Sequence, residues 1–145
     1  MDPCFAGHSI KVAQAIGGLP LARPAFLGVE YAAKAAPVRD EWHRLATGDD
    51  AEARAARAKL KSLSTFESRA RTDPLRAGDP VSRDRWPRDL VRDYGDELPN
   101  VFRFELADRW RGYYSIVGEP GGARLWVLYL WSHETYSRQS GYAKK

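Results

Sequence analysis

The sequence predicts an α+β domain in which helices come first and an antiparallel meander of three strands comes last. The carboxy-terminal part of the chain, from Val101 to Trp131, holds three strand-like runs that are separated by turn residues. Before it, from Ala51 to about Arg71, apolar residues recur at the three- and four-residue spacings of a helix. A short apolar run from Pro24 to Glu30 is a candidate first strand. Strands that follow a group of helices are typical of an α+β fold.

Length and composition limit the class of protein. A chain of 145 residues with 43% hydrophobic and 29% charged residues has the composition of one soluble domain. We expect residues 24–145 to form that domain and residues 1–23, which show little patterning, to be a loosely ordered lead-in. Cys4 is the only cysteine, which excludes an intramolecular disulfide and a cysteine-based zinc site and fits a reducing, cytoplasmic compartment. No run approaches the ~20 apolar residues of a membrane span, so we expect no membrane partner.

The helical part follows the candidate first strand. Tyr31 to Leu45 is helical in composition, and Pro37 suits a first turn, which predicts one helix from about Pro37 or two short helices. Thr47 to Asp50 ends this stretch and offers a cap for the next helix, from Ala51 to about Arg71. We expect the second helix to pack on the sheet through an apolar stripe formed by Ala53, Ala56, Leu60, Leu63 and Phe66 or Ala70.

The segment between the helices and the meander is predicted to be a loop. Thr72 to Pro87 is rich in Pro, Gly and Asp, which are turn residues. Pro87 to Tyr94 is expected to form a short helix that ends at Gly95. Apolar anchors should keep the loop ordered, and the candidates are Val81, Trp86 and Leu90.

A two-residue period identifies the first strand of the meander. From Val101 to Leu106, apolar side chains alternate with Arg103 and Glu105, so one face is apolar and the other is charged. Ala107 to Arg109 is short enough to connect this strand to the next one in a hairpin.

Two further strands complete the meander. Trp110 to Val117 places Arg111, Tyr113 and Ser115 on one face. After a turn at Glu119 to Gly122, the run from Ala123 to Trp131 is apolar apart from Arg124, as in a strand that is buried on both faces. His133 to Gly141 should follow as a turn or a short helix.

The long helix also has a basic flank. Between Arg54 and Arg71, six cations face only Glu67, in a chain whose net charge is +4. Such a concentration of charge predicts an anionic partner, with nucleic acid first, or else a solvated helix face. The residues that could reach an RNA strand are Arg54, Arg57, Lys61, Tyr113, Arg138, Lys144 and Lys145.

The end of the chain carries a family likeness. Phe102-Arg103 opens a strand, Trp110-Arg111 precedes Tyr113-Tyr114, and His133 and Tyr136 close the segment. In these features, roughly from Pro24 to Tyr142, the chain resembles the RelE/ParE toxin superfamily, specifically RelE-like toxins of type II toxin–antitoxin systems. The resemblance implies a RelE-like fold: a sheet of about four strands, antiparallel but mixed at one edge, with the N-terminal helices packed on one face.

The resemblance also implies a function. RelE-like toxins are mRNA interferases, which cleave messenger RNA on the translating ribosome and are neutralised by a cognate antitoxin in a hetero-oligomer. Their cleavage uses the ribose 2′-hydroxyl as nucleophile and needs neither metal nor cofactor. The ParE branch keeps the fold but inhibits DNA gyrase. A third hypothesis is a catalytically inactive, basic member of the family that binds nucleic acid or protein. Fold alone does not separate these functions.

Attack by a 2′-hydroxyl needs a base, cations for the charge on phosphorus and an acid for the leaving group. Arg111 matches the most consistent basic position of the family, which implies transition-state stabilisation; alternatively it pairs with Glu105 across the hairpin. Arg103 matches the first of two cations at alternate positions in some relatives. The second of these positions is Glu105 in this chain, a departure that favours a carboxylate base or a salt-bridge partner.

The remaining candidates follow the last strand. His133 lies where several relatives carry a catalytic His or Arg, so it is a candidate acid or a structural histidine. Tyr136 matches a near-terminal tyrosine of the family that orients phosphate or stacks on a base. Tyr113 could do the same or face solvent. His8 and His43 are too scattered relative to His133 for a metal site.

Overall fold

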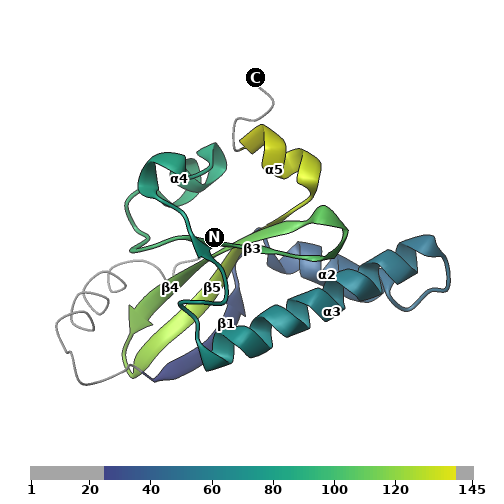
Figure 1. The fold of residues 1–145 in the computed structure, drawn as a ribbon, viewed down its shortest axis with the longest axis horizontal. Helices are drawn as coiled ribbons and strands as arrows, with labels where there is room; N and C mark the ends of the chain where they lie inside the picture. Colours follow the sequence, from purple (N-terminus) through teal and green to yellow (C-terminus); the bar gives the residue numbers. More distant parts are fainter. Residues whose placement is uncertain (1–24, 140–145) are drawn as a thin grey trace.

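The protein has an α+β fold built on one five-stranded mixed sheet. The computed structural model describes residues 25–139, so the lead-in predicted for residues 1–23 lies outside the described residues. The strand order across the sheet is β1-β5-β4-β3-β2. β1 runs parallel to β5 and the other neighbours are antiparallel, so the sheet is mixed at one edge (Figure 1). The strands are β1 (Phe26–Tyr31), β2 (Asp79–Pro80), β3 (Phe102–Glu105), β4 (Arg111–Glu119) and β5 (Gly122–Trp131).

The fifth strand corrects the expected number of about four. β2 pairs with β3 at the sheet edge, inside the segment that the sequence predicts to be a loop. Two residues are too few to show a period, and Pro80 is a residue that strands usually exclude. Gly78 permits the pairing, because a Cβ at this position would lie 2.5 Å from the Arg103 carbonyl oxygen. A 3-10 turn, η2 (Arg83–Arg85), follows in the same segment.

Helices α2 (Ala36–Leu45) and α3 (Ala51–Thr72) cover one face of the sheet (Figure 1). Pro37 stands in the first turn of α2, which confirms the single helix among the two predicted alternatives. Asp50 caps the N-terminus of α3, and its carboxylate accepts a hydrogen bond from the Ala53 backbone N–H at 2.9 Å. The predicted stripe is confirmed, since α3 buries Ala53, Ala56, Leu63, Phe66 and Ala70, and the partly buried Leu60 packs against the same core.

Aromatic rings join α3 to the sheet. The Phe66 ring stacks on the Phe104 ring with 3.7 Å between centroids, and Phe102 stacks on Tyr114 at 4.9 Å. Gly112, which pairs with Phe104, leaves room for this arrangement, because a Cβ there would approach the Phe104 ring to 2.2 Å. This contact needs a glycine at position 112.

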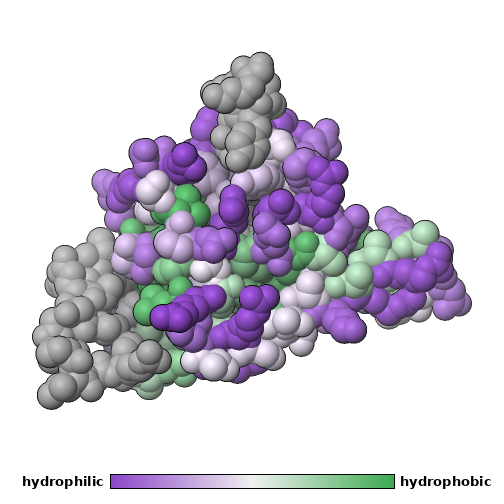
Figure 2. Space-filling model, viewed as in Figure 1, coloured by the Kyte–Doolittle hydropathy of each residue, from purple (hydrophilic) through white to green (hydrophobic). Residues whose placement is uncertain are grey.

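Helices α4 (Arg88–Tyr94) and α5 (His133–Gln139) lie on the opposite face of the sheet (Figure 1). They enclose a second, smaller core that includes Leu90, Val117, Leu128 and Tyr136. Hydrophilic residues gather over both helices (Figure 2), where Val91 of α4, 51% exposed, is an exception. None of the helices in residues 25–139 is long and apolar enough to cross a membrane.

The last strand contributes to both cores, as the sequence predicts. Leu125 and Val127 of β5 belong to the core under α2 and α3, whereas Leu128 and Tyr129 belong to the core under α4 and α5. A bulge places Leu128 and Tyr129 in the same core: Tyr113 pairs with Tyr129 and Tyr114 with Val127, so Leu128 is an extra residue in the ladder.

Candidate functional site

Two neighbouring strands present charged side chains to the face that α5 covers. Glu105 of β3 lies directly opposite Arg111 of β4, and Arg103 lies opposite Tyr113. The Arg111 Nε atom is 3.9 Å from a Glu105 carboxylate oxygen, and the Glu105 side chain is 67% exposed. An ion pair this exposed contributes about 0–1 kcal/mol to stability. Both alternatives for Glu105, a base or a salt-bridge partner, are therefore compatible with its position.

Tyr136 of α5 brings the two arginines together. Arg103 Nη1 donates a hydrogen bond to the Tyr136 hydroxyl at 2.6 Å. The Cζ atoms of Arg103 and Arg111 lie 5.7 and 5.3 Å from the centroid of the Tyr136 ring. Only 5% of Tyr136 is exposed. Two guanidinium groups thus lie beside one aromatic ring.

Two buried nitrogen atoms at this site are unsatisfied. Arg103 Nε and His133 Nδ1 have no hydrogen-bond partner among residues 25–139. A buried donor or acceptor in this state costs about 1–3 kcal/mol, and in native proteins such an atom often marks a functional group or the place of a ligand. His133 opens α5, two residues after Trp131, which pairs with Arg111. The strands and α5 therefore bring Arg103, Arg111, His133 and Tyr136 into one region.

The turn between β3 and β4 helps to fix Arg111. This turn, η3 (Ala107–Arg109), holds two consecutive residues with positive φ, Asp108 at 60° and Arg109 at 62°. Such backbone angles are unfavourable for side chains other than glycine. The Ala107 N–H is held by the Ser62 hydroxyl at 3.0 Å, and Arg111 Nη1 donates to the Arg109 carbonyl at 3.2 Å. The strained turn thus supplies an acceptor that orients the Arg111 side chain.

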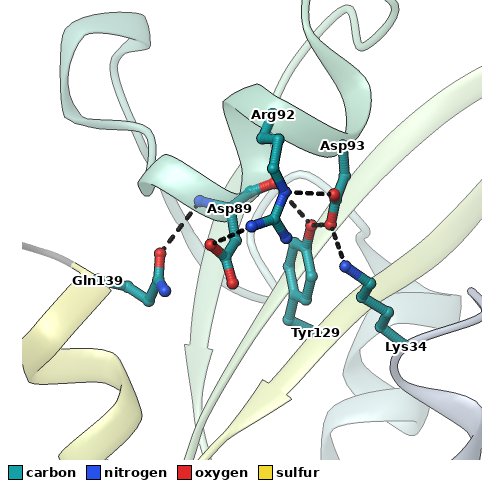
Figure 3. Close-up of polar contacts among 6 residues, drawn as sticks. All are labelled: Lys34, Asp89, Arg92, Asp93, Tyr129 and Gln139. Carbon is teal, nitrogen blue, oxygen red and sulfur yellow. Dashed lines mark hydrogen bonds and ion pairs between the residues drawn. The ribbon is translucent and has the colours of Figure 1, made fainter.

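Helix α5 is tied to α4 at its other end. The Gln139 side-chain oxygen accepts a hydrogen bond from the Asp89 backbone N–H at 3.1 Å, and Arg92 bridges to the Asp89 carboxylate at 3.1 Å (Figure 3). Asp89 lies in the first turn of α4, where backbone N–H groups lack helical partners. Gln139 therefore helps to hold α5 over the strand face.

Asp93 anchors α4 to the rest of the fold. Its carboxylate accepts hydrogen bonds from the Tyr129 hydroxyl at 2.5 Å, from Lys34 Nζ at 2.8 Å and from Arg92 Nε at 3.0 Å (Figure 3). Burial alone would raise the pKa of Asp93, but these hydrogen bonds outweigh it and lower the pKa to about 2. Burial and the neighbouring Asp93 carboxylate raise the pKa of Tyr129 far above its ordinary value. Both groups therefore keep one protonation state through the physiological range.

The predicted RNA-binding residues of α3 lie in the other layer. Arg54 Nη1 donates to the Asp49 carbonyl at 3.2 Å, and Arg57 Nη1 donates to the carbonyls of Ala46 and Gly48 at 2.8 and 2.9 Å. These two arginines thus hold the loop between α2 and α3. Lys61 is exposed on α3. All three residues are on the helix layer that covers the opposite face of the sheet from α5.

The other predicted contacts differ among themselves. Tyr113 is 3% exposed and packs edge-on against Trp131, so it does not face solvent. Arg138 is exposed on α5 and lies 3.8 Å from the Glu134 carboxylate. Lys144 and Lys145 lie outside the described residues.

The sequence predicts that Trp131 belongs to the core or, if exposed, stacks on RNA, and it gives Gln139 no role. The structure places Trp131 opposite Arg111 and uses Gln139 as the link to α4. The position of Trp131, two residues before His133, was the available signal, but its meaning depends on a strand register that the bulge at Tyr113 sets. No local pattern predicts the hydrogen bond between Gln139 and Asp89, because these residues are 50 positions apart in the sequence.

The chemistry of the assembled side chains suits a phosphate group. Two guanidinium groups can form paired hydrogen bonds with phosphate oxygens, and an imidazole and a carboxylate can move protons. Within residues 25–139 there is no group of three His, Cys, Asp or Glu side chains that could hold a metal ion. No protein-family model matches the sequence, and no curated protein matches it.

Proposed function

We propose that this protein is a RelE-like toxin, a ribosome-dependent endoribonuclease that cuts messenger RNA and is neutralised by a cognate antitoxin. The observation that carries the proposal is the convergence of Arg103 and Arg111 on Tyr136. The unsatisfied Nε of Arg103 adds to it, since a phosphate oxygen would supply the missing acceptor. The order of elements and the mixed sheet agree with the fold that the family likeness implies.

In this proposal each side chain has a role in one displacement at phosphorus. Glu105 takes the proton of the ribose 2′-hydroxyl, whose oxygen attacks the adjacent phosphorus atom. Arg103 and Arg111 bind the phosphate oxygens that gain charge in the transition state. The bond from phosphorus to the 5′-oxygen breaks, and His133 gives a proton to that oxygen. Tyr136 orients the phosphate, and the products carry a 2′,3′-cyclic phosphate and a 5′-hydroxyl.

Access to the site bears on regulation. Tyr136 is nearly buried and its hydroxyl accepts a hydrogen bond from Arg103, so α5 covers part of the charged strand face. The Glu105 side of the site is open. An antitoxin segment would silence the toxin by covering the charged strand face or by displacing α5. Binding that left Arg103 and Arg111 exposed would contradict both modes.

The test is a translation assay with purified ribosomes and a defined messenger RNA, followed by analysis of the fragment ends. The protein should produce 2′,3′-cyclic phosphate ends, and Arg111→Ala should slow cleavage by about a hundredfold or more. Arg44→Ala is the matched control, because Arg44 is an exposed arginine of α2, whose carboxylate partner is Glu41. Intact messages, or equal activity of the Arg111 and Arg44 variants, would refute the nuclease proposal.

One observation favours a second candidate, an inactive member of the family that binds a partner. In the folded chain Arg103 donates a hydrogen bond to the Tyr136 hydroxyl, and the Glu105 carboxylate lies 3.9 Å from Arg111. Both groups thus already have partners inside the protein. Binding of ribosomes or RNA by this protein, without cleavage of the RNA, would support this candidate. Inhibition of gyrase supercoiling with intact messages would instead support a ParE-like function.

A further inference from the structure

Trp131 has a position that its role in packing does not explain. It is the last residue of β5 and the direct cross-strand neighbour of Arg111. Side chains of such a pair begin about 5 Å apart and extend from the same face of the sheet. The Trp131 ring contacts the rings of Tyr129, at 4.7 Å between centroids, and of Tyr113, at 5.3 Å. It therefore extends the aromatic surface beside the arginines.

The indole N–H of Trp131 differs from that of Trp86, which has an acceptor in the protein. Trp86 donates its N–H to the Val81 carbonyl at 3.2 Å. Trp110 packs edge-on against Trp42 and has the Lys59 ammonium 4.7 Å from its centroid. Within residues 25–139 the Trp131 N–H has no acceptor, and it is not among the buried nitrogen atoms that lack one. Part of this indole therefore reaches solvent next to Arg111.

A cation and a partly exposed aromatic ring on neighbouring strands match the two parts of a nucleotide. Arg111 suits the phosphate, and proteins that bind single-stranded RNA stack its bases on aromatic side chains. In a duplex the bases are stacked on each other and cannot reach such a ring. The pair thus selects a single strand whose bases are free.

We infer that Trp131 is a specificity-determining residue that receives the nucleobase beside the phosphate bound by Arg111. The inference rests on the proposed function, because it needs a phosphate on Arg111. It adds that the ligand is single-stranded RNA with an unstacked base at the site. Tyr113 and Tyr129 act as positioning residues, since they hold the indole ring.

The test compares two short RNA strands that the protein cannot cut. Both carry 2′-O-methyl groups, and one of them lacks its bases. Trp131→Leu should weaken binding of the base-containing strand by about tenfold or more and leave binding of the abasic strand unchanged. Trp131→Phe, which keeps an aromatic ring, should lose less. Trp86→Phe is the matched control, because Trp86 is a partly buried tryptophan of the same core.

The outcomes separate the inference from the proposed function. Equal weakening of both strands by Trp131→Leu would show a structural role and overturn the inference, as would no weakening of either. If Arg111→Ala left binding of the abasic strand unchanged, the phosphate contact of the proposed function would fail whatever Trp131 does. No measurable binding of either strand by the unsubstituted protein would overturn the inference, whereas the ribosome assay decides the proposed function. Circular dichroism and thermal unfolding show which variants remain folded.

Discussion

The two faces of the sheet are built from different chemistry. Under α2 and α3 the contacts are apolar and tightly stacked, as in the pair of Phe66 and Phe104. Under α4 and α5 the core is smaller, and beside it lies Arg103, whose buried Nε has no hydrogen-bond partner among residues 25–139. We infer that the first face supplies most of the stability and that the second face can therefore carry groups that are costly to bury.

The cations of the two layers differ in the same way. Arg57 of α3 donates hydrogen bonds to two backbone carbonyls, so its guanidinium group holds the loop between α2 and α3. Arg103 and Arg111 contact a neutral ring and have no carboxylate closer than the 3.9 Å between Arg111 and Glu105 among the described residues. A basic patch in the sequence is thus a weaker sign of an anion site than cations that strand pairing brings together.

The two faces of the sheet should differ most in how much they contribute to the free energy of unfolding. Phe66→Ala removes a ring that is 2% exposed and stacked on Phe104, and should lower the free energy of unfolding by about 3–5 kcal/mol. Arg111→Ala should lower it less, by about 1 kcal/mol, because the Glu105 carboxylate that pairs with Arg111 is 67% exposed. Urea unfolding of both variants measures the difference. Equal losses would show that the α5 face also carries the stability of the fold.

The next effect concerns Asp93, which fixes α4. Its folded pKa of about 2 lies below the ordinary value of 3.8, so its carboxylate stabilises the fold above about pH 4 and loses this contribution as the pH falls toward 2. The contribution is at most about 2 kcal/mol, because one fifth of the side chain is exposed. Asp93→Asn should remove it, so the difference in unfolding free energy between the variants should shrink from pH 5 to pH 2. A constant difference would show that the ionised carboxylate of Asp93 does not stabilise the fold.

Two substitutions at residues with positive φ test the backbone strain of the turns. Arg109 has φ 62° beside the site, and Arg109→Gly should raise the free energy of unfolding by up to about 1 kcal/mol. Gly95, with φ 58° at the end of α4, provides the reverse case, and Gly95→Ala should lower it by about 1 kcal/mol. Thermal unfolding measures both. Destabilisation by Arg109→Gly would mean that the side chain of Arg109 makes a contact that outweighs its backbone strain.

A further substitution tests the basic flank of α3. Arg57→Ala removes the hydrogen bonds to Ala46 and Gly48, and should lower the free energy of unfolding by about 0.5–1.5 kcal/mol. We expect its affinity for RNA to remain unchanged. Paired urea unfolding and RNA titration check this. A loss of RNA affinity with unchanged stability would make α3 part of the interface, as its composition predicts.

The parts of the fold that depend on local patterns could be predicted. The spacing of apolar residues identified α3, and the two-residue period placed Arg103 and Glu105 on one face of β3. The pairing of Glu105 with Arg111 followed from the short hairpin. These features need only the geometry of one or two neighbouring elements.

The parts that depend on distant contacts could not be predicted. β2 has two residues and exists because Gly78 lets the chain approach Arg103 closely. Tyr113 was expected to contact RNA or solvent, but it is buried in the core that α4 and α5 enclose. The bond between Arg103 and Tyr136 spans 33 positions, and no periodicity encodes it.

The most direct test of the central claim is the salt dependence of RNA binding, because each lost phosphate contact lowers the slope of log affinity against log salt by about 0.7–1. We predict this decrease for Arg103→Ala and for Arg111→Ala, and an unchanged slope for Arg54→Ala, whose guanidinium holds a loop carbonyl. An unchanged slope in both strand-face variants, or an equal decrease in the Arg54 variant, would contradict the assignment of the phosphate site to the α5 face.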